Sequence, residues 1–257
     1  MLMKYLYITI LIIAVFSCKQ TNQDDNQKNK KSENLSNNES FEENLIRKIE
    51  AELNIPATES YTYKIYSEEL NGDDSLDYII TVNRLNFALD KAIEKGNIAQ
   101  RAEMGYTGNY NFFFYVDGKS KKMTPSIPVP SSPYSKLEVS FEKIKTEEYR
   151  DILIDYRIRN SKFRRYFSVS NKIPLETFQT MIYDGLGTEN SIAFHIKYEP
   201  GSYSTSKDIL IYKAKMKNFT IKKPNDIYFI NPEIIPTKEL ERLWFFNPSK
   251  NKYFTMK

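Results

Sequence analysis

The sequence has few of the residues from which catalytic and redox sites are usually built. Among its 257 residues there is one cysteine, Cys18, and one histidine, His195. A single cysteine excludes an internal disulfide, and zinc or iron catalysis generally needs several imidazole or thiolate ligands. No Gly-x-Ser-x-Gly sequence accompanies His195, so a serine hydrolase is not indicated. We expect His195 to be a strand residue without a catalytic role.

Long hydrophobic runs and a strong charge of one sign are also absent. The apolar run over residues 5–16 is too short to cross a bilayer, which takes about 20 residues of helix. The formal net charge is +4 and is spread along the chain. Proteins that bind nucleic acid usually concentrate far more positive charge on one face. The composition therefore argues against a membrane-spanning helix and against nucleic acid as a partner.

The N-terminus has the pattern of a secretory signal peptide. Lys4 precedes the apolar run, and Val15-Phe16-Ser17-Cys18 stands at its end. These four residues resemble a bacterial lipobox, although Phe16 is larger than the usual residue there. The resemblance implies cleavage after residue 17, modification of Cys18 by diacylglycerol and palmitate, and anchoring to the membrane by several acyl chains. The alternative is a buried or free thiol, which the polar residues after Cys18 do not favour.

Residues 19–40 have the composition of a disordered tether. Leu35 is their only large apolar residue, and their charges cancel. Such a segment cannot bury enough surface to offset the entropy lost on ordering. The pair Asp24-Asp25 resembles signals that send some lipoproteins to the outer face of the outer membrane. We therefore expect a tether over residues 18–40 and a location in the cell envelope, at the outer membrane and exposed on its surface.

The remaining residues, 41–257, have the composition of one β-rich domain. The chain contains 19 Tyr and 16 Phe, and aromatic residues favour strands. Many short strand signals separated by turns indicate antiparallel sheets. The predicted fold is α+β and predominantly antiparallel β, sandwich-like or with strongly curved sheets, with a few peripheral helices. A sub-boundary is possible near the Pro-rich residues 125–135.

Local patterns give the expected elements. Helices are predicted over residues 40–54, where Ser40 and Glu43 form a capping box, over 86–104 and over 237–246. Asp117-Gly118 predicts a two-residue hairpin turn. No repeat unit is recognised. Strands are predicted over 61–67, 78–85, 109–116, 136–145, 149–159, 162–170, 191–198, 208–215, 219–222 and 227–231.

One loop carries the side chains of a calcium site. It runs from Glu69 through Asn71-Gly72-Asp73-Asp74-Ser75 to Asp77 and resembles the loop of FG-GAP and VCBS repeats. The resemblance implies side-chain ligands from the first, third, fifth and ninth positions and a backbone carbonyl from the seventh. The matching residues are Glu69, Asn71, Asp73, Ser75 and Asp77. Oxygen ligands of this kind suit Ca²⁺, although Glu69 and Asp74 depart from the usual Asp and Gly. The alternative is an acidic turn without an ion.

Two other sets of residues invite a functional interpretation. Arg157, Arg159, Arg164 and Arg165 form the most basic stretch and could hold an anion, a sulfated glycan or lipid head groups. Strand alternation places Arg157 and Arg159 on one face, where they could equally be a solvated sheet surface. The run Trp244-Phe245-Phe246 could stack on sugars, or dock a C-terminal helix onto the sheet.

Two functional classes remain open. The first is a non-enzymatic envelope lipoprotein that binds a protein, a glycan or another envelope component, or is mainly structural, with calcium as a stabilising ion of the acidic loop. The second is a glycan hydrolase with two catalytic carboxyl groups. Such an enzyme would hold the two carboxyls about 5–9.5 Å apart in a concave pocket.

Overall fold

The structure, a computed structural model, describes residues 26–27, 40–94, 108–217, 219–223, 226–227 and 229–255. The predicted signal peptide, Cys18 and nearly all of the predicted tether lie outside these residues. So does the part of the predicted helix 86–104 that follows Glu94. No helix in the described part of the chain is long and apolar enough to span a membrane.

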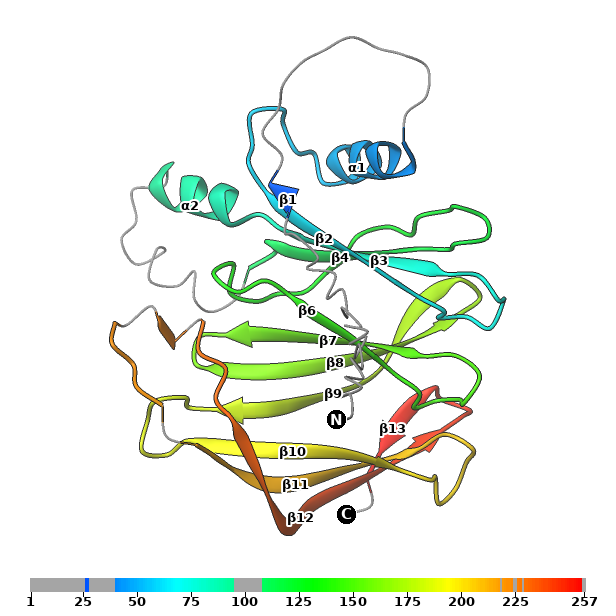
Figure 1. Cartoon of the computed structure of the whole chain (residues 1–257), viewed down its shortest axis with the longest axis vertical. Helices are drawn as coiled ribbons and strands as arrows, with labels where there is room; N and C mark the ends of the chain where they lie inside the picture. Colours follow the sequence, from blue (N-terminus) through cyan, green and yellow to red (C-terminus); the bar gives the residue numbers. More distant parts are fainter. Residues whose placement is uncertain are drawn as a thin grey trace, which may run out of the picture.

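Two antiparallel sheets and two helices make up the fold, which confirms the predicted mostly antiparallel architecture (Figure 1). The helices are α1 (Phe41–Glu52) and α2 (Leu85–Glu94). The first sheet contains, in order, β1 (Asn26–Gln27), β2 (Thr62–Glu68), β3 (Asp77–Asn83), β4 (Asn111–Val116) and β5 (Ile127–Pro128). The second contains β6 (Glu138–Glu142), β7 (Asp151–Ile158), β8 (Ser161–Ser170), β9 (Ile173–Asp184), β10 (Ile192–Glu199), β11 (Asp208–Met216), β12 (Ile234–Asn247) and β13 (Lys252–Phe254), each beside its sequence neighbour.

Helix α1 covers the outer face of the first sheet. Its start is the predicted capping box, in which the Ser40 hydroxyl accepts from the Glu43 N–H while the Glu43 carboxylate accepts from the Ser40 N–H. Burial of an aliphatic side chain of this size contributes about 1.5–3 kcal/mol, so packing holds the helix more firmly than its cap does. The buried residues that join helix and sheet include Leu45, Ile46, Ile49, Ile80, Val82 and Phe114.

The opposite face of the first sheet packs onto the second sheet. Phe113 of β4 meets Phe167 of β8 at a steep angle, with ring centroids 5.0 Å apart. Ile79 and Tyr115 from the first sheet and Ile152 from the second belong to the same buried cluster. Strand alternation therefore sends one face of β3 and β4 to α1 and the other to the second sheet.

The connection between the sheets is itself buried. Residues 125–135, where the sequence suggests a sub-boundary, contain Ser131 and Ser132, both completely inaccessible to solvent. The buried Asn111 amide donates to the Ser131 hydroxyl at 2.9 Å and to the Ser132 carbonyl at 3.1 Å. These hydrogen bonds fix the segment to the start of β4.

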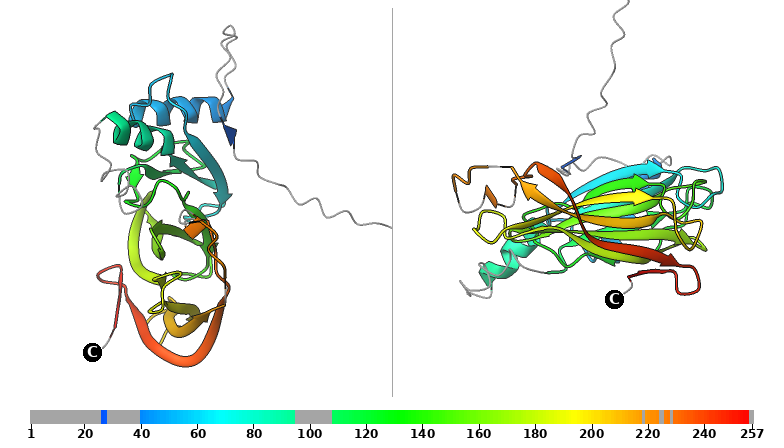
Figure 2. Two further views of the ribbon diagram at one scale, coloured as in Figure 1. Left: turned by 90° about the vertical axis from the view of Figure 1, so that its left-hand side faces the viewer. Right: turned by 90° about the horizontal axis from the view of Figure 1, so that it is seen from below.

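The second sheet is strongly curved, as Figure 2 shows from the side. Strands β9 and β10 pair at only two positions, which allows the later strands to turn back over the earlier ones. As a result Phe178 of β9 contacts Trp244 of β12 and Tyr253 of β13, with centroid distances of 4.9 and 5.6 Å. A third core, which also contains Tyr166, fills the concave side.

Several predictions of local structure are wrong. Residues 237–246 belong to strand β12, not to a helix, because seven residue pairs join β12 to β11. Residues 219–222 and 227–231 do not form strands in the described part of the chain. Strand β9 is missing from the prediction, since polar residues such as Glu176 and Gln179 obscure its alternation.

The Asp117-Gly118 turn also differs from the prediction. The loop is longer than two residues, because the Asp117 carbonyl accepts from the Lys121 N–H at 2.8 Å and the Asp117 N–H donates to Lys122. Glycine is required at position 118 because a side chain would not fit there, and not because the residue has a positive φ. A Cβ at this position would lie 1.8 Å from the Leu76 carbonyl oxygen.

Three hairpins of the fold are built alike, although no repeat is evident in the sequence. The loops of β2–β3, β6–β7 and β10–β11 each have eight residues, 69–76, 143–150 and 200–207, and lie at the same end of the molecule (Figure 1). Each loop touches the next, since the Arg150 N–H donates to the Glu69 carbonyl at 3.2 Å and the Lys207 N–H to the Ile144 carbonyl at 2.8 Å. In each hairpin a Glu ends the first strand and faces an Asp that begins the second: Glu68 and Asp77, Glu142 and Asp151, Glu199 and Asp208.

Candidate functional site

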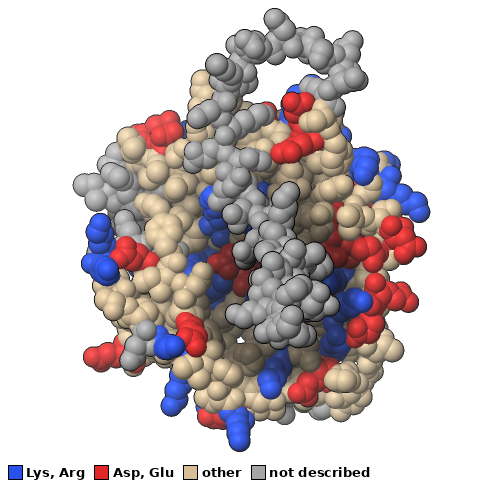
Figure 3. Space-filling model, viewed as in Figure 1, with Lys and Arg blue, Asp and Glu red and all other residues tan. Residues whose placement is uncertain are grey.

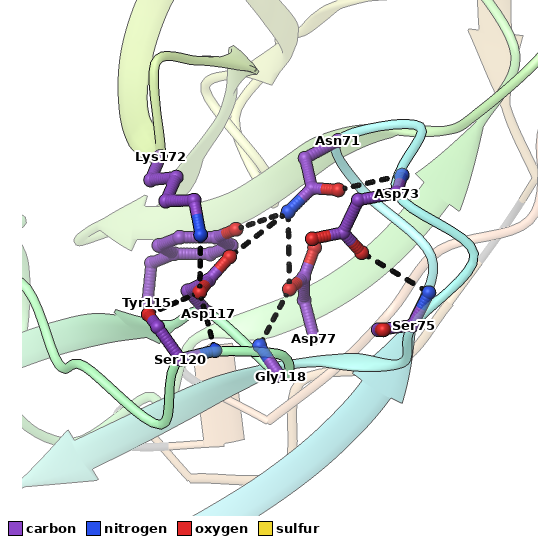
Figure 4. Close-up of polar contacts among 9 residues, drawn as sticks. All are labelled: Asn71, Asp73, Ser75, Asp77, Tyr115, Asp117, Gly118, Ser120 and Lys172. Carbon is purple, nitrogen blue, oxygen red and sulfur yellow. Dashed lines mark hydrogen bonds and ion pairs between the residues drawn. The ribbon is translucent and has the colours of Figure 1, made fainter.

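Surface charge does not single out a site on the face shown in Figure 3, where acidic and basic side chains are interspersed. The candidate site is the acidic loop between β2 and β3. Its side chains cap their own backbone (Figure 4). The Asn71 Oδ1 accepts from the Asp73 N–H at 3.0 Å, and the Asp73 Oδ1 accepts from the Ser75 N–H at 3.1 Å. Gly72 and Asp74 have positive φ angles of 76° and 60°, so Asp74 makes the bend for which the related loops use Gly.

The Asp77 side chain holds this loop closed by accepting hydrogen bonds from the backbone. The side chain is inaccessible to solvent; its Oδ1 accepts from the Gly118 N–H at 2.8 Å and its Oδ2 from the Leu70 N–H at 3.3 Å. Burial raises the pKa of Asp77, against the lowering effect of these hydrogen bonds. The Asn71 amide also donates to Asp77, at 3.4 Å. Asp77 thus holds together both ends of the loop and the turn after β4.

Three residues outside the predicted set complete the cluster. The Asn71 amide donates to the Tyr115 hydroxyl at 3.1 Å and to the buried Asp117 Oδ1 at 3.2 Å. The Lys172 amine, from the β8–β9 turn, donates to the Asp117 Oδ2 at 2.8 Å. Only the pairing of β3 with β4 and the packing of the sheets bring these residues together, so the sequence around the loop gives no sign of them.

The environment of Asp117 favours its charged form. Burial alone would raise the pKa of Asp117, but hydrogen bonds from Lys172 and Ser120 and the charge of Lys172 together lower it to about 2. Burial is the main cause that raises the pKa of Tyr115 above its usual range. The Lys172 ammonium group thus already neutralises the charge of Asp117.

The predicted ligands converge only in part on a cation site. Asn71, Asp73 and Asp77 lie together, and the Asp73 Oδ2 is buried without a hydrogen-bond partner among the described residues. The Glu69 Oε1 is likewise buried without a partner among the described residues. The Asn71 side chain, however, directs its amide hydrogens towards Asp77 and Asp117. Within the described residues no group of three or more His, Cys, Asp or Glu side chains could hold a metal ion.

The loops 143–150 and 200–207 show that an Asp can close such a loop without the acidic pattern of a calcium site. Asp151 accepts from the Lys145 N–H at 2.6 Å, and Asp208 accepts from the Ser202 N–H at 2.9 Å, so both close their loops as Asp77 does. Their loops nevertheless lack the acidic pattern. The first, third and fifth positions are Lys143, Lys145 and Glu147 in one loop and Pro200, Ser202 and Ser204 in the other. The Asp at the ninth position is therefore a structural element that does not depend on a metal.

The four arginines proposed as an anion site are not brought together. Arg157 is buried and donates to the carbonyls of Ile227 and Ile230 at 2.9 and 2.7 Å. Arg164 forms a two-pronged ion pair with Asp155 at 2.6 and 3.0 Å. Arg165 pairs with Glu176, and Arg159 lies in the β7–β8 turn. Each of the three strand arginines is used within the fold.

His195 and the walls of two cavities in the described part of the chain show no pair of acidic side chains. His195 is a half-buried residue of β10 that faces Tyr212 across the strand pair. A surface cavity of about 340 Å³ lies between the β9–β10 loop and the segment after β11, lined by Gly187, Thr188, Ser191, Met216, Lys217, Phe219 and Ile221. Neither this cavity nor a smaller one beside β2 and β3 is lined by an Asp or Glu.

No family model, curated protein or solved structure matches this chain. Its function is therefore inferred from its own residues. The features that remain for this purpose are the N-terminal sequence, the acidic loop and the exposed surface of the domain.

Proposed function

We propose that this chain is a lipid-anchored lipoprotein of a bacterial cell envelope, whose β-rich domain binds a protein or a glycan without catalysis. The observation that carries the proposal is the N-terminal sequence. A short apolar run ends at Val15-Phe16-Ser17-Cys18, and Cys18 is the only cysteine of the chain. The polar residues 19–40 would then separate the anchor from the domain. The pair Asp24-Asp25 supports placement at the outer membrane, on its outer face.

Binding is favoured over catalysis by how the polar side chains are used. Asp77 closes a loop, Asp117 is paired with Lys172, and Arg164 is paired with Asp155. A general acid or base would need to reach a substrate from a pocket. The described cavities lack carboxyl groups at their walls, so the glycan hydrolase has no supporting observation.

Lipid modification can be tested directly. The full chain and a Cys18→Ala variant would be expressed in a bacterium with an outer membrane, in the presence of radiolabelled palmitate. The parent should incorporate the label and enter the detergent phase on phase separation, whereas the variant should do neither. A parent that takes up no label, or a variant that takes up as much, would refute the anchor.

The second part of the proposal is that the acidic loop binds calcium. Asp73 is the residue whose substitution tests it. The Asp73 Oδ2 is buried without a partner among the described residues, and Asp73 itself makes only one hydrogen bond to the backbone. Calcium at 100 times its dissociation constant should raise the free energy of unfolding of the parent by about 2.7 kcal/mol, and so raise its unfolding midpoint. An Asp73→Ala variant should lose this response. A parent whose midpoint is the same in calcium and in chelator would leave the loop as an acidic turn.

A further inference from the structure

Two exposed aromatic rings and one half-buried ring lie together where the β10–β11 loop meets the β12–β13 hairpin. Tyr203 of that loop is 68% exposed, and its ring meets Phe245 of β12 with centroids 4.9 Å apart and planes at 82°. Phe254 of β13 faces Phe245 across the strand pair and is 41% exposed. We refer to Tyr203, Phe245 and Phe254 as the aromatic corner.

The aromatic corner lies on the side of the sheet opposite the core. Trp244 and Phe246 point inward, where Phe178 and Tyr253 contact them. Phe245 lies between them in sequence, so alternation sends it outward. The Trp244-Phe245-Phe246 run is thus divided between core and surface. Exposed rings contribute little to folding stability, whereas a ligand could cover their apolar faces.

A buried carboxylate oxygen adjoins the aromatic corner. In the first two hairpins the closing Asp satisfies its second oxygen from the following strand: Asp77 accepts from Gly118 after β4, and Asp151 accepts from Ser168 of β8. Asp208 is 2% exposed and uses its Oδ2 for Ser202, but its Oδ1 has no hydrogen-bond partner in the described part of the chain.

The strand register shows where this oxygen lies relative to the corner. Ile209 pairs with Trp244, so Asp208 and Phe245 are neighbours across β11 and β12. By analogy with Asp77 and Asp151, the free Oδ1 faces β12. A buried acceptor without a hydrogen-bond partner is unfavourable, and a donor from a ligand would remove this penalty.

We propose that the aromatic corner is a carbohydrate-binding site, in which a sugar ring stacks on the exposed aromatic faces and a sugar hydroxyl donates to the Asp208 Oδ1. Sugars combine an apolar C–H face with hydroxyl donors, which matches aromatic rings beside an unpartnered carboxylate oxygen. Because Oδ1 is shielded from solvent, the hydroxyl reaches it through a small movement of the loop that carries Tyr203. The proposal rests on the binding role proposed above and names its class of ligand.

The test uses the full chain, extracted in lauryldimethylamine oxide because that detergent contains no sugar. Chitohexaose, cellohexaose, maltohexaose and a hyaluronan hexasaccharide are titrated separately by calorimetry. At least one should bind, and Tyr203→Ala and Phe254→Ala should each weaken binding tenfold or more, equivalent to about 1.4 kcal/mol. Tyr203→Phe should retain binding because it keeps the ring. Phe41→Ala, which removes an aromatic side chain 40% exposed on α1, should leave binding unchanged.

Three results would overturn the proposal. In the first, none of the four sugars binds the parent at millimolar concentration. In the second, Tyr203→Ala and Phe254→Ala bind as tightly as the parent. In the third, the parent is a dimer that Tyr203→Ala converts to a monomer, since a second copy would then cover the aromatic corner. Unfolding curves of the variants show whether each remains folded, and palmitate labelling tests the anchor independently of any sugar.

Discussion

Asp77, Asp151 and Asp208 occupy equivalent positions but should contribute unequally to stability. In an Asp77→Ala variant, the N–H groups of Leu70 and Gly118 both lose their acceptor, and both residues are buried. An orphaned buried donor costs about 1–3 kcal/mol, while loss of the carboxylate recovers part of its desolvation energy. We expect Asp77→Ala to lower the free energy of unfolding by about 2–4 kcal/mol.

The other two positions provide matched comparisons. Asp151→Ala removes the acceptor of the Lys145 N–H and of the buried Ser168 hydroxyl, so it should cost about 2–4 kcal/mol, as at Asp77. Asp208→Ala removes the acceptor of Ser202, which is exposed and can bond to water, and it also removes the unpartnered buried Oδ1, so a cost of about 1 kcal/mol or less is expected. Urea unfolding followed through the fluorescence of Trp244, the only tryptophan, would measure all three. Equal losses at the three positions, or a negligible loss at Asp77, would refute this account of loop closure.

Three further predictions concern the turns and the buried arginine. Asp117 has its pKa lowered from 3.8 to about 2 in the folded state, so its stabilising effect is present above pH 3.8 and is lost as the pH falls towards 2. In an acid titration of unfolding, Lys172→Met should lose less stability than the parent as the pH falls from 3.8 towards 2, because Lys172 is one of the groups that lower the pKa of Asp117. An unchanged profile would contradict the ion pair. Gly118→Ala should be strongly destabilised in thermal melts, since its Cβ would lie 1.8 Å from a backbone oxygen, and a parent-like melting temperature would count against this turn geometry. Arg157→Met should speed tryptic cleavage in the segment that follows β11, to which Arg157 donates, whereas Arg242→Met at an exposed position should not.

Local signals in the sequence predict the elements that depend on local physics. The capping box at Ser40 and the four-residue spacing that follows it give α1, and short runs rich in Ile, Leu and Tyr give strands such as β7 and β11. Helix propensity fails for β12, because Lys238-Glu239-Leu240-Glu241-Arg242 favours a helix in isolation. Pairing with β11 and the inward placement of Trp244 determine its structure instead.

The sequence pattern predicts the residues of the candidate site that lie within the acidic loop, but not those that contact the loop from other strands. Asn71, Asp73 and Asp77 stand close in sequence and lie together in space, as the pattern predicts. Asp117 reaches them through the β3–β4 pairing, and Lys172 through the contact between the two sheets. A lysine that arrives from another sheet changes the charge of an acidic loop, and no pattern within the loop can reveal it.

The comparison of the three hairpins also indicates which residues of the acidic loop are available for function. All three loops are closed by an Asp at the same position, and the loop 200–207 is closed with Ser202 and Ser204 at the positions of Asn71 and Asp73. Folding of the first loop therefore requires Asp77 but does not require a carboxylate at Asp73. In the third hairpin the closing Asp has a free oxygen beside exposed rings, which neither of the others shows among the described residues. The three hairpins thus share one frame but carry different surfaces, the acidic loop in the first and the aromatic corner in the third, and substitutions outside the closing Asp can test the two binding proposals separately.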